Sequence, residues 1–233
     1  MAYANQSNVT VHDYRENNRR FRDRFAKYDR GSVIDELPFF GVVLGARRTG
    51  KSVFLADMMQ GKIPPVSFDY DRYAYFSDSP VEGVQTTSYR DLTMPRGKEG
   101  QHSLVIFDDP PMENMEFRTM LNELARNGRH QGMSVLTTFH AIQDLGSTKN
   151  PYVRQNMDML IVPSKYAAKN QRAMSMYKIF GSRARELDKN PDAFNYNILN
   201  NRGDLHVIKR GGEGSQSRKD NEQEQHFRPR NRE

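Results

Sequence analysis

Short, nearly continuous apolar runs alternate along the chain with longer stretches whose apolar residues recur every three or four positions. The short runs are typical of buried strands and lie at residues 39–44, 72–76, 104–107, 133–139 and 159–162. The longer stretches are typical of amphipathic helices and lie at residues 51–60, 112–127 and 164–180. A glycine follows each of them, at Gly61, Gly128 and Gly181, as is common where a helix ends. Buried strands that alternate with helices predict an α/β fold with a mostly parallel central sheet flanked by helices.

Two further apolar segments lie near the C-terminal end of this pattern. Residues 194–199 and 205–209 flank the turn-forming sequence Asn-Asn-Arg-Gly, which predicts a β-hairpin. The stretch 77–101 is rich in loop residues, and one short strand is expected in it near 84–87. The chain shows no internal repeat.

The two ends of the chain are more polar than this middle part. Residues 1–35 are rich in arginine and carry aromatic residues with separations of seven, four and three, namely Tyr14, Phe21, Phe25 and Tyr28. This spacing predicts an N-terminal helical arm that packs through one face; a basic arm that contacts DNA or capsid is the alternative. Residues 211–233 contain one large apolar residue, Phe227, and predict a disordered polar tail. A single core domain at 36–210 lies between the arm and the tail.

Composition narrows the class of protein. Apolar residues make up 36% of the chain and the mean hydropathy is −0.86, which fits a small core with polar ends. The chain has no cysteine, so disulfides and thiolate metal sites are excluded. No stretch reaches the roughly 20 apolar residues of a membrane span, and no signal-peptide core is present, so we expect a soluble protein in a cytosol-like compartment. The net charge of +6 permits a polyanionic partner such as DNA, although charge alone favours it only slightly.

The residues between the strand at 39–44 and the helix at 51–60 form a phosphate-binding motif. Their sequence, Gly-Ala-Arg-Arg-Thr-Gly-Lys-Ser, matches the Walker A pattern G-x-x-x-x-G-K-[ST]. Backbone N–H groups and the helix dipole make such a loop an anion site; Lys51 would reach the β- and γ-phosphates, and the Ser52 hydroxyl would bind Mg²⁺. The predicted ATP-binding residues are Gly45, Ala46, Arg47, Arg48, Thr49, Gly50, Lys51, Ser52 and Val53. A turn and helix start without a ligand is the alternative.

Two carboxylates follow the apolar strand at 104–107, as at the end of a Walker B strand. Because ligands bind at the carboxyl ends of strands in open α/β sheets, we expect Asp108 to bind Mg²⁺ beside the phosphates. Asp109 would orient and activate the attacking water, which indicates hydrolysis. A strand that ends in a polar turn is the alternative. His140 follows the strand at 133–139 and would hydrogen-bond phosphate or the attacking water, or else only cap or pack the strand end.

The order of these motifs resembles the FtsK/HerA superfamily. It comprises Gly-Ala-Arg-Arg-Thr-Gly-Lys-Ser-Val, apolar-Asp-Asp, Gly-Arg-His-Gln-Gly-Met-Ser and Tyr-Val-Arg-Gln-Asn-Met-Asp, within residues 38–180. Within the superfamily the chain is similar to the genome-packaging ATPases of membrane-containing and poxvirus-like double-stranded DNA viruses. The resemblance implies that the domain at 36–210 is a P-loop NTPase of the additional-strand, RecA-like type, with a further strand between the Walker A and Walker B strands.

The resemblance also implies a homo-oligomeric ring, a hexamer or pentamer, with double-stranded DNA in its channel. ATP would bind between subunits, and an arginine of the neighbour would stabilise the γ-phosphate, with Arg129 and Arg154 as candidates. For each arginine an internal sensor or a salt bridge is the alternative. Two positions depart from the family pattern, because cellular members have Glu in place of Asp109 and the polar sensor at His140 is commonly Gln. The Arg47-Arg48 pair is also unusual, and contact with phosphate or a neighbour is as well supported as exposure to solvent.

The two nucleotide motifs predict ATP hydrolysis, and the resemblance implies a motor that uses it to translocate double-stranded DNA and package a viral genome into a preformed capsid. ATP and Mg²⁺ are the expected ligands, and capsid-vertex or membrane proteins are the expected partners. The expected location is the host cytoplasm during assembly, or the virion at a packaging vertex. Candidate DNA-contacting residues are Arg90, Arg96, Lys98, Lys165, Lys169 and Arg172. The alternatives are a P-loop kinase of a small molecule and a nucleotide-switched assembly protein with little turnover.

Overall fold

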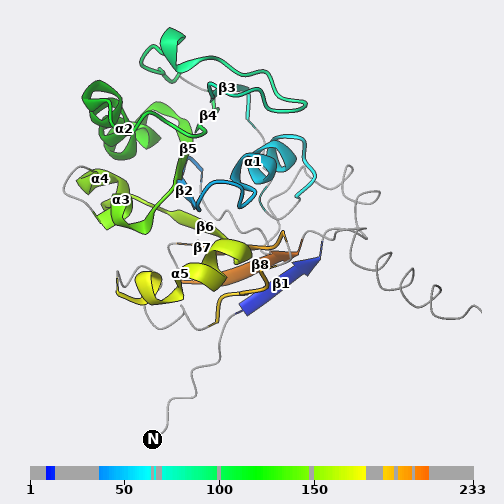
Figure 1. Ribbon diagram of the computed structural model, residues 1–233. Coiled ribbons are helices and arrows are strands. Elements are labelled where there is room, and N and C mark those ends of the chain that lie inside the picture. Colours follow the sequence, from blue (N-terminus) through cyan, green and yellow to red (C-terminus); the bar gives the residue numbers. More distant parts are fainter. Residues whose placement is uncertain are drawn as a thin grey trace, which may run out of the picture.

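Eight strands form one sheet in the computed structural model, which describes residues 9–13, 37–63, 66, 70–98, 101–146, 150–176, 186–191, 194–200 and 203–209. The strands are β1 (Val9–Asp13), β2 (Phe40–Leu44), β3 (Arg72–Phe76), β4 (Ser103–Phe107), β5 (Met133–Phe139), β6 (Met159–Pro163), β7 (Tyr196–Asn200) and β8 (Leu205–Lys209). Their order is β1-β8-β7-β6-β2-β5-β4-β3 (Figure 1). Only β7 runs antiparallel to its neighbours among these strands, so the predicted mostly parallel α/β sheet is confirmed.

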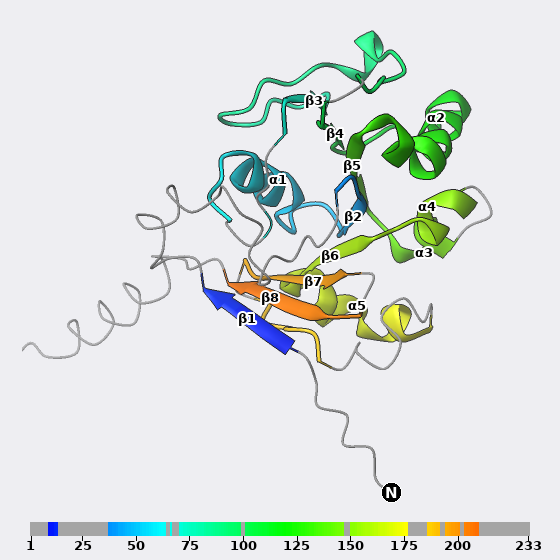
Figure 2. The ribbon, with the colours of Figure 1, turned by 180° about the vertical axis from the view of Figure 1, so that it is seen from behind.

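Helices cover both faces of the sheet (Figures 1 and 2). They are α1 (Lys51–Met59), α2 (Met115–Asn127), α3 (Ile142–Gly146), α4 (Pro151–Gln155) and α5 (Ser164–Met176). Side chains alternate between the faces along each strand: on β4, Leu104 and Ile106 join the core under α1, whereas Phe107 joins the core under the other helices. Because both faces are covered, the inner strands are buried at every position, which explains their continuous apolar sequence.

The helix ends follow local chemistry. The second helix begins at Met115, three residues later than predicted, because the Asn114 side chain accepts hydrogen bonds from the backbone N–H groups of Glu116 and Phe117. The first helix ends at Met59, one residue before the predicted end, and Gly61 follows in the left-handed region at φ +66°. Helix α5 is described as far as Met176, so its predicted end lies outside the described residues.

The structure contains elements that the sequence pattern does not predict. Within the predicted N-terminal arm, Val9–Asp13 forms β1 and pairs in parallel with β8. The aromatic positions of that arm and the tail at 211–233 lie outside the described residues. Helices α3 and α4 lie between β5 and β6. The predicted short strand near 84–87 is present only as isolated bridges, Phe76 to Thr87 and Val81 to Val84. Among the described residues, no helix is long and apolar enough to cross a membrane.

Strand order and register bring three loops together. Strand β5 lies between β2 and β4, and this is the additional strand that the family resemblance implies. Leu44 pairs with Phe139, and Phe107 pairs with Thr137. The carboxyl ends of β2, β4 and β5 therefore lie at one edge of the sheet, called here the carboxyl edge, and the opposite edge is the amino edge.

Candidate active site

The Walker A loop connects β2 to α1 at the carboxyl edge. Its backbone enters the left-handed region at Arg48 (φ 64°) and at Gly50 (φ 93°). Thr49 is buried, and its hydroxyl donates to the carbonyl of Ala46 at 2.8 Å. A Cβ at Gly45 would lie 2.5 Å from the Thr49 hydroxyl oxygen, so glycine is required for this closed loop. The loop therefore has the compact shape of an anion cradle at a helix N-terminus.

Lys51, the first residue of α1, lies inside the loop with 6% exposure. Its Nζ donates to the carbonyl oxygens of Gly45 at 2.6 Å and Ala46 at 3.2 Å, and it lies 3.3 Å from Nδ1 of His140. Burial lowers the pKa of Lys51, and the carboxylates of Asp108 and Asp109 oppose that shift. The ammonium group thus lies where the loop would surround a phosphate.

Five of the predicted ATP-binding residues are exposed. They belong to the loop and to the first turn of α1, and they are Ala46, Arg47, Arg48, Ser52 and Val53. After burial, the largest cause, the positive charge of Arg47 also lowers the pKa of Lys51. The exposed Ser52 hydroxyl is accessible to a metal ion at the start of the helix.

Asp108 follows β4 and is buried, with 2% exposure. Its Oδ2 accepts a hydrogen bond from the Tyr75 hydroxyl at 3.1 Å, while Oδ1 has no hydrogen-bond partner among the described residues. A buried carboxylate oxygen without a partner is costly unless it binds a cation. Oxygen donors are the ligands that Mg²⁺ prefers, so Asp108 and the Ser52 hydroxyl fit this ion. The described residues contain no group of three acidic or histidine side chains, so phosphate and water would complete its coordination.

Asp109 and His140 are joined to Lys51 by a chain of hydrogen bonds. The lysine ammonium can only donate, so Nδ1 of His140 accepts and Nε2 carries the ring proton. Nε2 donates that proton to Oδ1 of Asp109. Both side chains are open to solvent, at 39% for His140 and 56% for Asp109. The structure therefore brings together the predicted phosphate-binding, sensing and water-activating residues.

The two candidate arginines lie elsewhere. Arg129 is in a single 3₁₀ turn (Arg129–Gln131) before β5, at the amino edge, and its Nη1 pairs with Oδ1 of Asp158 at 2.9 Å. Oδ2 of Asp158 accepts from the backbone N–H of Phe40, which fixes the ion pair to the start of β2. Arg154 is exposed on α4, shortly before the start of β6. The loops that follow β2, β4 and β5 at the carboxyl edge are called here the loop cluster, and neither arginine lies in the loop cluster of its own chain. Arg129 forms a salt bridge within this chain, which was one of the predicted alternatives.

The site also depends on residues that the sequence motifs do not indicate. Tyr75 holds Asp108, Thr138 accepts from the backbone N–H of Asp109 at 2.8 Å, and Tyr196 donates to the carbonyl of Gly50 at 3.0 Å. Each comes from a strand whose position beside the site follows from sheet order alone. The position of Thr138 could have been predicted from the sequence, because a strand between the Walker A and Walker B strands must place its last residues beside the Walker B carboxylates.

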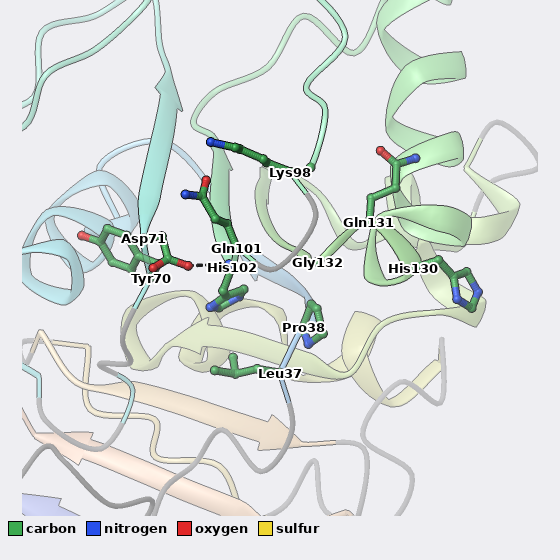
Figure 3. Close-up of a pocket in the computed structure, with 11 residues that line it drawn as sticks. Leu37, Pro38, Tyr70, Asp71, Lys98, Gln101, His102, His130, Gln131 and Gly132 are labelled. Atoms are coloured by element: carbon green, nitrogen blue, oxygen red, sulfur yellow. Dashed lines mark hydrogen bonds between the residues drawn. The ribbon is translucent and has the colours of Figure 1, made fainter.

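A pocket of about 930 Å³ lies at the amino edge (Figure 3). Tyr70, His102 and Gly132 are among its lining residues, and the carboxylate of Asp71 accepts from the backbone N–H of His102 at 2.7 Å. None of the predicted ATP-binding, metal or catalytic residues lines this pocket. The open loop cluster and this pocket are separate features of the molecule.

The candidate DNA-contacting residues are dispersed. Arg90, Arg96, Lys98 and Lys169 are exposed, and Lys165 is half-buried with its Nζ 5.9 Å from the centre of the Phe194 ring. Lys98 lines the amino-edge pocket, whereas Arg90 follows Tyr89 near the carboxyl edge. The side chain of Arg172 lies outside the described part. Among the candidates that the structure describes, Lys98 and Arg90 therefore lie toward opposite edges of the sheet.

No family model and no curated protein matches this chain. Its structure is similar to the genome packaging NTPase B204 from Sulfolobus turreted icosahedral virus 2 in complex with AMPPCP, with a TM-score of 0.51 at 14% identity over 75% of this chain and 99% of that chain. For the complex of B204 with ATP-gammaS the TM-score is 0.49 at 15% identity, over 76% of this chain and 100% of that chain.

A second similar structure is the cytoplasmic domain of the type VII secretion ATPase EccC from Thermomonospora curvata. Its TM-score is 0.48 at 12% identity, over 76% of this chain and 26% of that chain. The likeness to B204 at a TM-score of 0.51 confirms the predicted P-loop NTPase fold.

Proposed function

We propose that this protein hydrolyses ATP and uses the reaction to translocate double-stranded DNA during packaging of a viral genome. The observation that carries the proposal is the hydrogen-bonded chain from Lys51 through His140 to Asp109, beside the buried Asp108. These hydrogen bonds link Lys51, which would bind the γ-phosphate, to Asp109, which would activate water. A module that only binds phosphate does not need the second carboxylate.

The residues divide the chemistry among them. Lys51 and the backbone N–H groups of the loop would bind the phosphates, while Ser52 and Asp108 would hold Mg²⁺, which neutralises charge on the phosphate oxygens when bound. Asp109 would orient a water molecule and accept its proton as the water oxygen attacks the γ-phosphorus. The bond from the γ-phosphorus to the ADP oxygen then breaks, and ADP leaves with the electron pair. His140 would hold the Asp109 carboxylate in position through its Nε2–H group.

The proposal includes a ring in which each site lies between two subunits. Arg129 and Arg154 both lie away from the loop of their own chain, which is the placement that an arginine acting on a neighbour requires. Such an arginine would stabilise charge on the transferring phosphoryl group. We further propose that the ring works in the host cytoplasm during assembly, at a capsid vertex or with viral membrane proteins.

The central test is ATP turnover by the purified protein with and without double-stranded DNA. We expect turnover that DNA stimulates, and its loss in Lys51→Ala and Asp109→Asn. Lys62→Ala is the matched control, because Lys62 is an exposed lysine that only approaches Asp57 at 3.8 Å. Transfer of phosphate to a metabolite without DNA would support a kinase instead. Nucleotide binding without hydrolysis at any DNA concentration would support a nucleotide-switched assembly protein.

Mixing two inactive variants tests the shared site. Lys51→Ala subunits lack the loop lysine, and Arg154→Ala subunits lack the candidate arginine. If Arg154 acts on the neighbour, a mixed ring contains interfaces with both groups intact, and turnover returns. The same experiment with Arg129→Ala decides between the two arginines. Failure of every mixture to regain turnover, with rings formed, would contradict an arginine supplied by the neighbour.

A further inference from the structure

The peptide group that joins Asp108 to Asp109 is held at both of its polar atoms by side chains from different elements. The Tyr89 hydroxyl donates to the carbonyl oxygen of Asp108 at 3.0 Å. The backbone N–H of Asp109 donates to the Thr138 hydroxyl oxygen at 2.8 Å. One contact comes from the single 3₁₀ turn Tyr89–Asp91, and the other comes from β5.

This peptide group sets the directions of both carboxylates. Asp109 has φ 53°, in the left-handed region that a residue with a Cβ enters at a cost of roughly 1 kcal/mol. Rotation of the peptide group toward an extended conformation would relieve that strain and turn the Asp109 carboxylate away from His140. The surrounding structure must therefore hold the conformation, and two side-chain hydrogen bonds to one peptide group do so.

We propose that Tyr89 and Thr138 are positioning residues that clamp this peptide group and thereby aim Asp109 for hydrolysis, an inference that rests on the proposed function. Neither residue would touch the nucleotide. They act through the backbone of Asp108 and Asp109, so loss of either should slow the chemical step more than it weakens nucleotide binding.

Two aromatic neighbours and a backbone hydrogen bond place Tyr89 for this role. Its ring lies 6.3 Å from the ring of Phe76 and meets the ring of Phe117 edge-on at 5.7 Å, measured between centroids. Its backbone N–H donates to the carboxylate of Asp78 at 3.0 Å. These contacts hold the ring so that its hydroxyl lies beside the carbonyl oxygen of Asp108.

Thr138 contributes through the additional strand. Thr138 on β5 accepts from the backbone N–H of Asp109, and His140, the residue that directly follows β5, contacts the Asp109 carboxylate. Thr138 is buried, at 1% exposure, and water cannot readily replace its hydroxyl. A strand between β2 and β4 thus positions Asp109 at two points, and this gives the additional strand a direct part in the chemistry.

Three variants and a control test the clamp. Tyr89→Phe keeps the packed ring and removes the hydroxyl, Thr138→Val keeps the shape and removes the acceptor, and Thr138→Ser restores an acceptor. Tyr73→Phe is the matched control, because Tyr73 lies on β3 with 41% exposure. We expect kcat to fall about two- to tenfold in Tyr89→Phe and Thr138→Val, with KM nearly unchanged, as the loss of one hydrogen bond implies. Thr138→Ser and Tyr73→Phe should keep the wild-type kcat.

Hydrogen exchange at the Asp109 amide gives a second readout that does not depend on turnover. We expect exchange to be about tenfold faster in Thr138→Val, faster by a smaller factor in Tyr89→Phe, and unchanged in Thr138→Ser. Wild-type kcat in both Tyr89→Phe and Thr138→Val would overturn the positioning role. Unchanged exchange in Thr138→Val would overturn the clamp itself. If the wild-type protein hydrolyses no ATP, the proposed function fails, and the exchange rates alone decide whether the peptide group is clamped.

Discussion

Removing the Tyr75 hydroxyl should destabilise the nucleotide-free protein, because the buried carboxylate of Asp108 then loses its hydrogen-bond donor. In Tyr75→Phe the ring stays in the core, where Tyr75 is 1% exposed, so little apolar burial is lost. The hydroxyl is the hydrogen-bond donor to Oδ2 of Asp108 at 3.1 Å. Oδ1 already has no partner among the described residues, so the substitution leaves the buried carboxylate with neither oxygen satisfied by a described side chain.

The expected cost is about 2 kcal/mol of unfolding free energy. A hydrogen bond to a charged group contributes about 1.5–3 kcal/mol, and at 2% exposure Asp108 has little access to replacement water. Removing the charge as well should recover most of this loss, so Tyr75→Phe in an Asp108→Asn background should cost less than about 1 kcal/mol. Addition of Mg²⁺ and ADP should stabilise Tyr75→Phe more than wild type, because a cation would satisfy the carboxylate.

Urea unfolding at neutral pH, with and without Mg²⁺ and ADP, measures these differences through the midpoint at constant m-value. Tyr73→Phe is the control for loss of an exposed tyrosine hydroxyl and should stay within about 0.5 kcal/mol of wild type. An unfolding free energy of Tyr75→Phe within that same range would refute the reasoning. So would an equal loss in the Asp108→Asn background, because the cost would then not come from the buried charge.

Three further predictions concern the loop, the amino edge and alkaline pH. Gly50→Ala should lower the free energy of unfolding in urea by more than about 1–2 kcal/mol and weaken nucleotide binding, because at φ 93° the new Cβ would lie 2.9 Å from a tyrosine hydroxyl. Gly61→Ala is the control: it has a similar φ of 66° but no atom within 4 Å of the new Cβ, so it should lower the free energy of unfolding by only about 1 kcal/mol. Arg129→Met should lower the free energy of unfolding by about 0.5–1 kcal/mol, since the ion pair that it removes is partly exposed. Because Arg129 lies at the amino edge, the nucleotide Kd of the isolated chain should stay nearly the same, and a change of more than threefold would contradict this placement. Burial raises the pKa of Tyr75 and Tyr89 above the value of about 10 for unfolded tyrosine, so the folded state retains these protons above pH 10. Urea unfolding free energies should therefore fall by up to about 1.4 kcal/mol per pH unit for each tyrosine as the pH rises above 10, and a flat profile would contradict the raised pKa values.

Much of the fold could be predicted because its signals are local. Strands buried on both faces must be continuously apolar, and for this reason the residues from Phe40 to Leu44 and from Met133 to Phe139 stand out in the sequence. Helices α3 and α4 have five residues each, too few for a helical period to show. Strand β1 lies in a polar segment and is defined by backbone pairing with β8, a contact with no local signal.

The same distinction applies to the candidate site. Lys51, Asp108 and Asp109 belong to motifs with fixed spacing, so the sequence places them at strand and helix ends. Tyr75 and Tyr89 act on Asp108 from neighbouring segments, and their contacts depend on register and packing, which no short motif encodes. Sequence reasoning therefore predicts the groups that would meet the nucleotide better than the groups that hold them in place.

Strands β1 and β8 are the first and the last strands of the described part of the chain, and their pairing affects the order in which the fold can be completed during synthesis. Val9 is in register with Leu205, so β1 leaves the ribosome long before its partner exists. At about 5–20 residues per second, roughly 10–40 s separate the synthesis of the two strands. The α/β core around the Walker loop can form in that interval, whereas this edge of the sheet closes last. Chains that stop before Leu205 leave β1 unpaired and β7 as an open edge prone to aggregation.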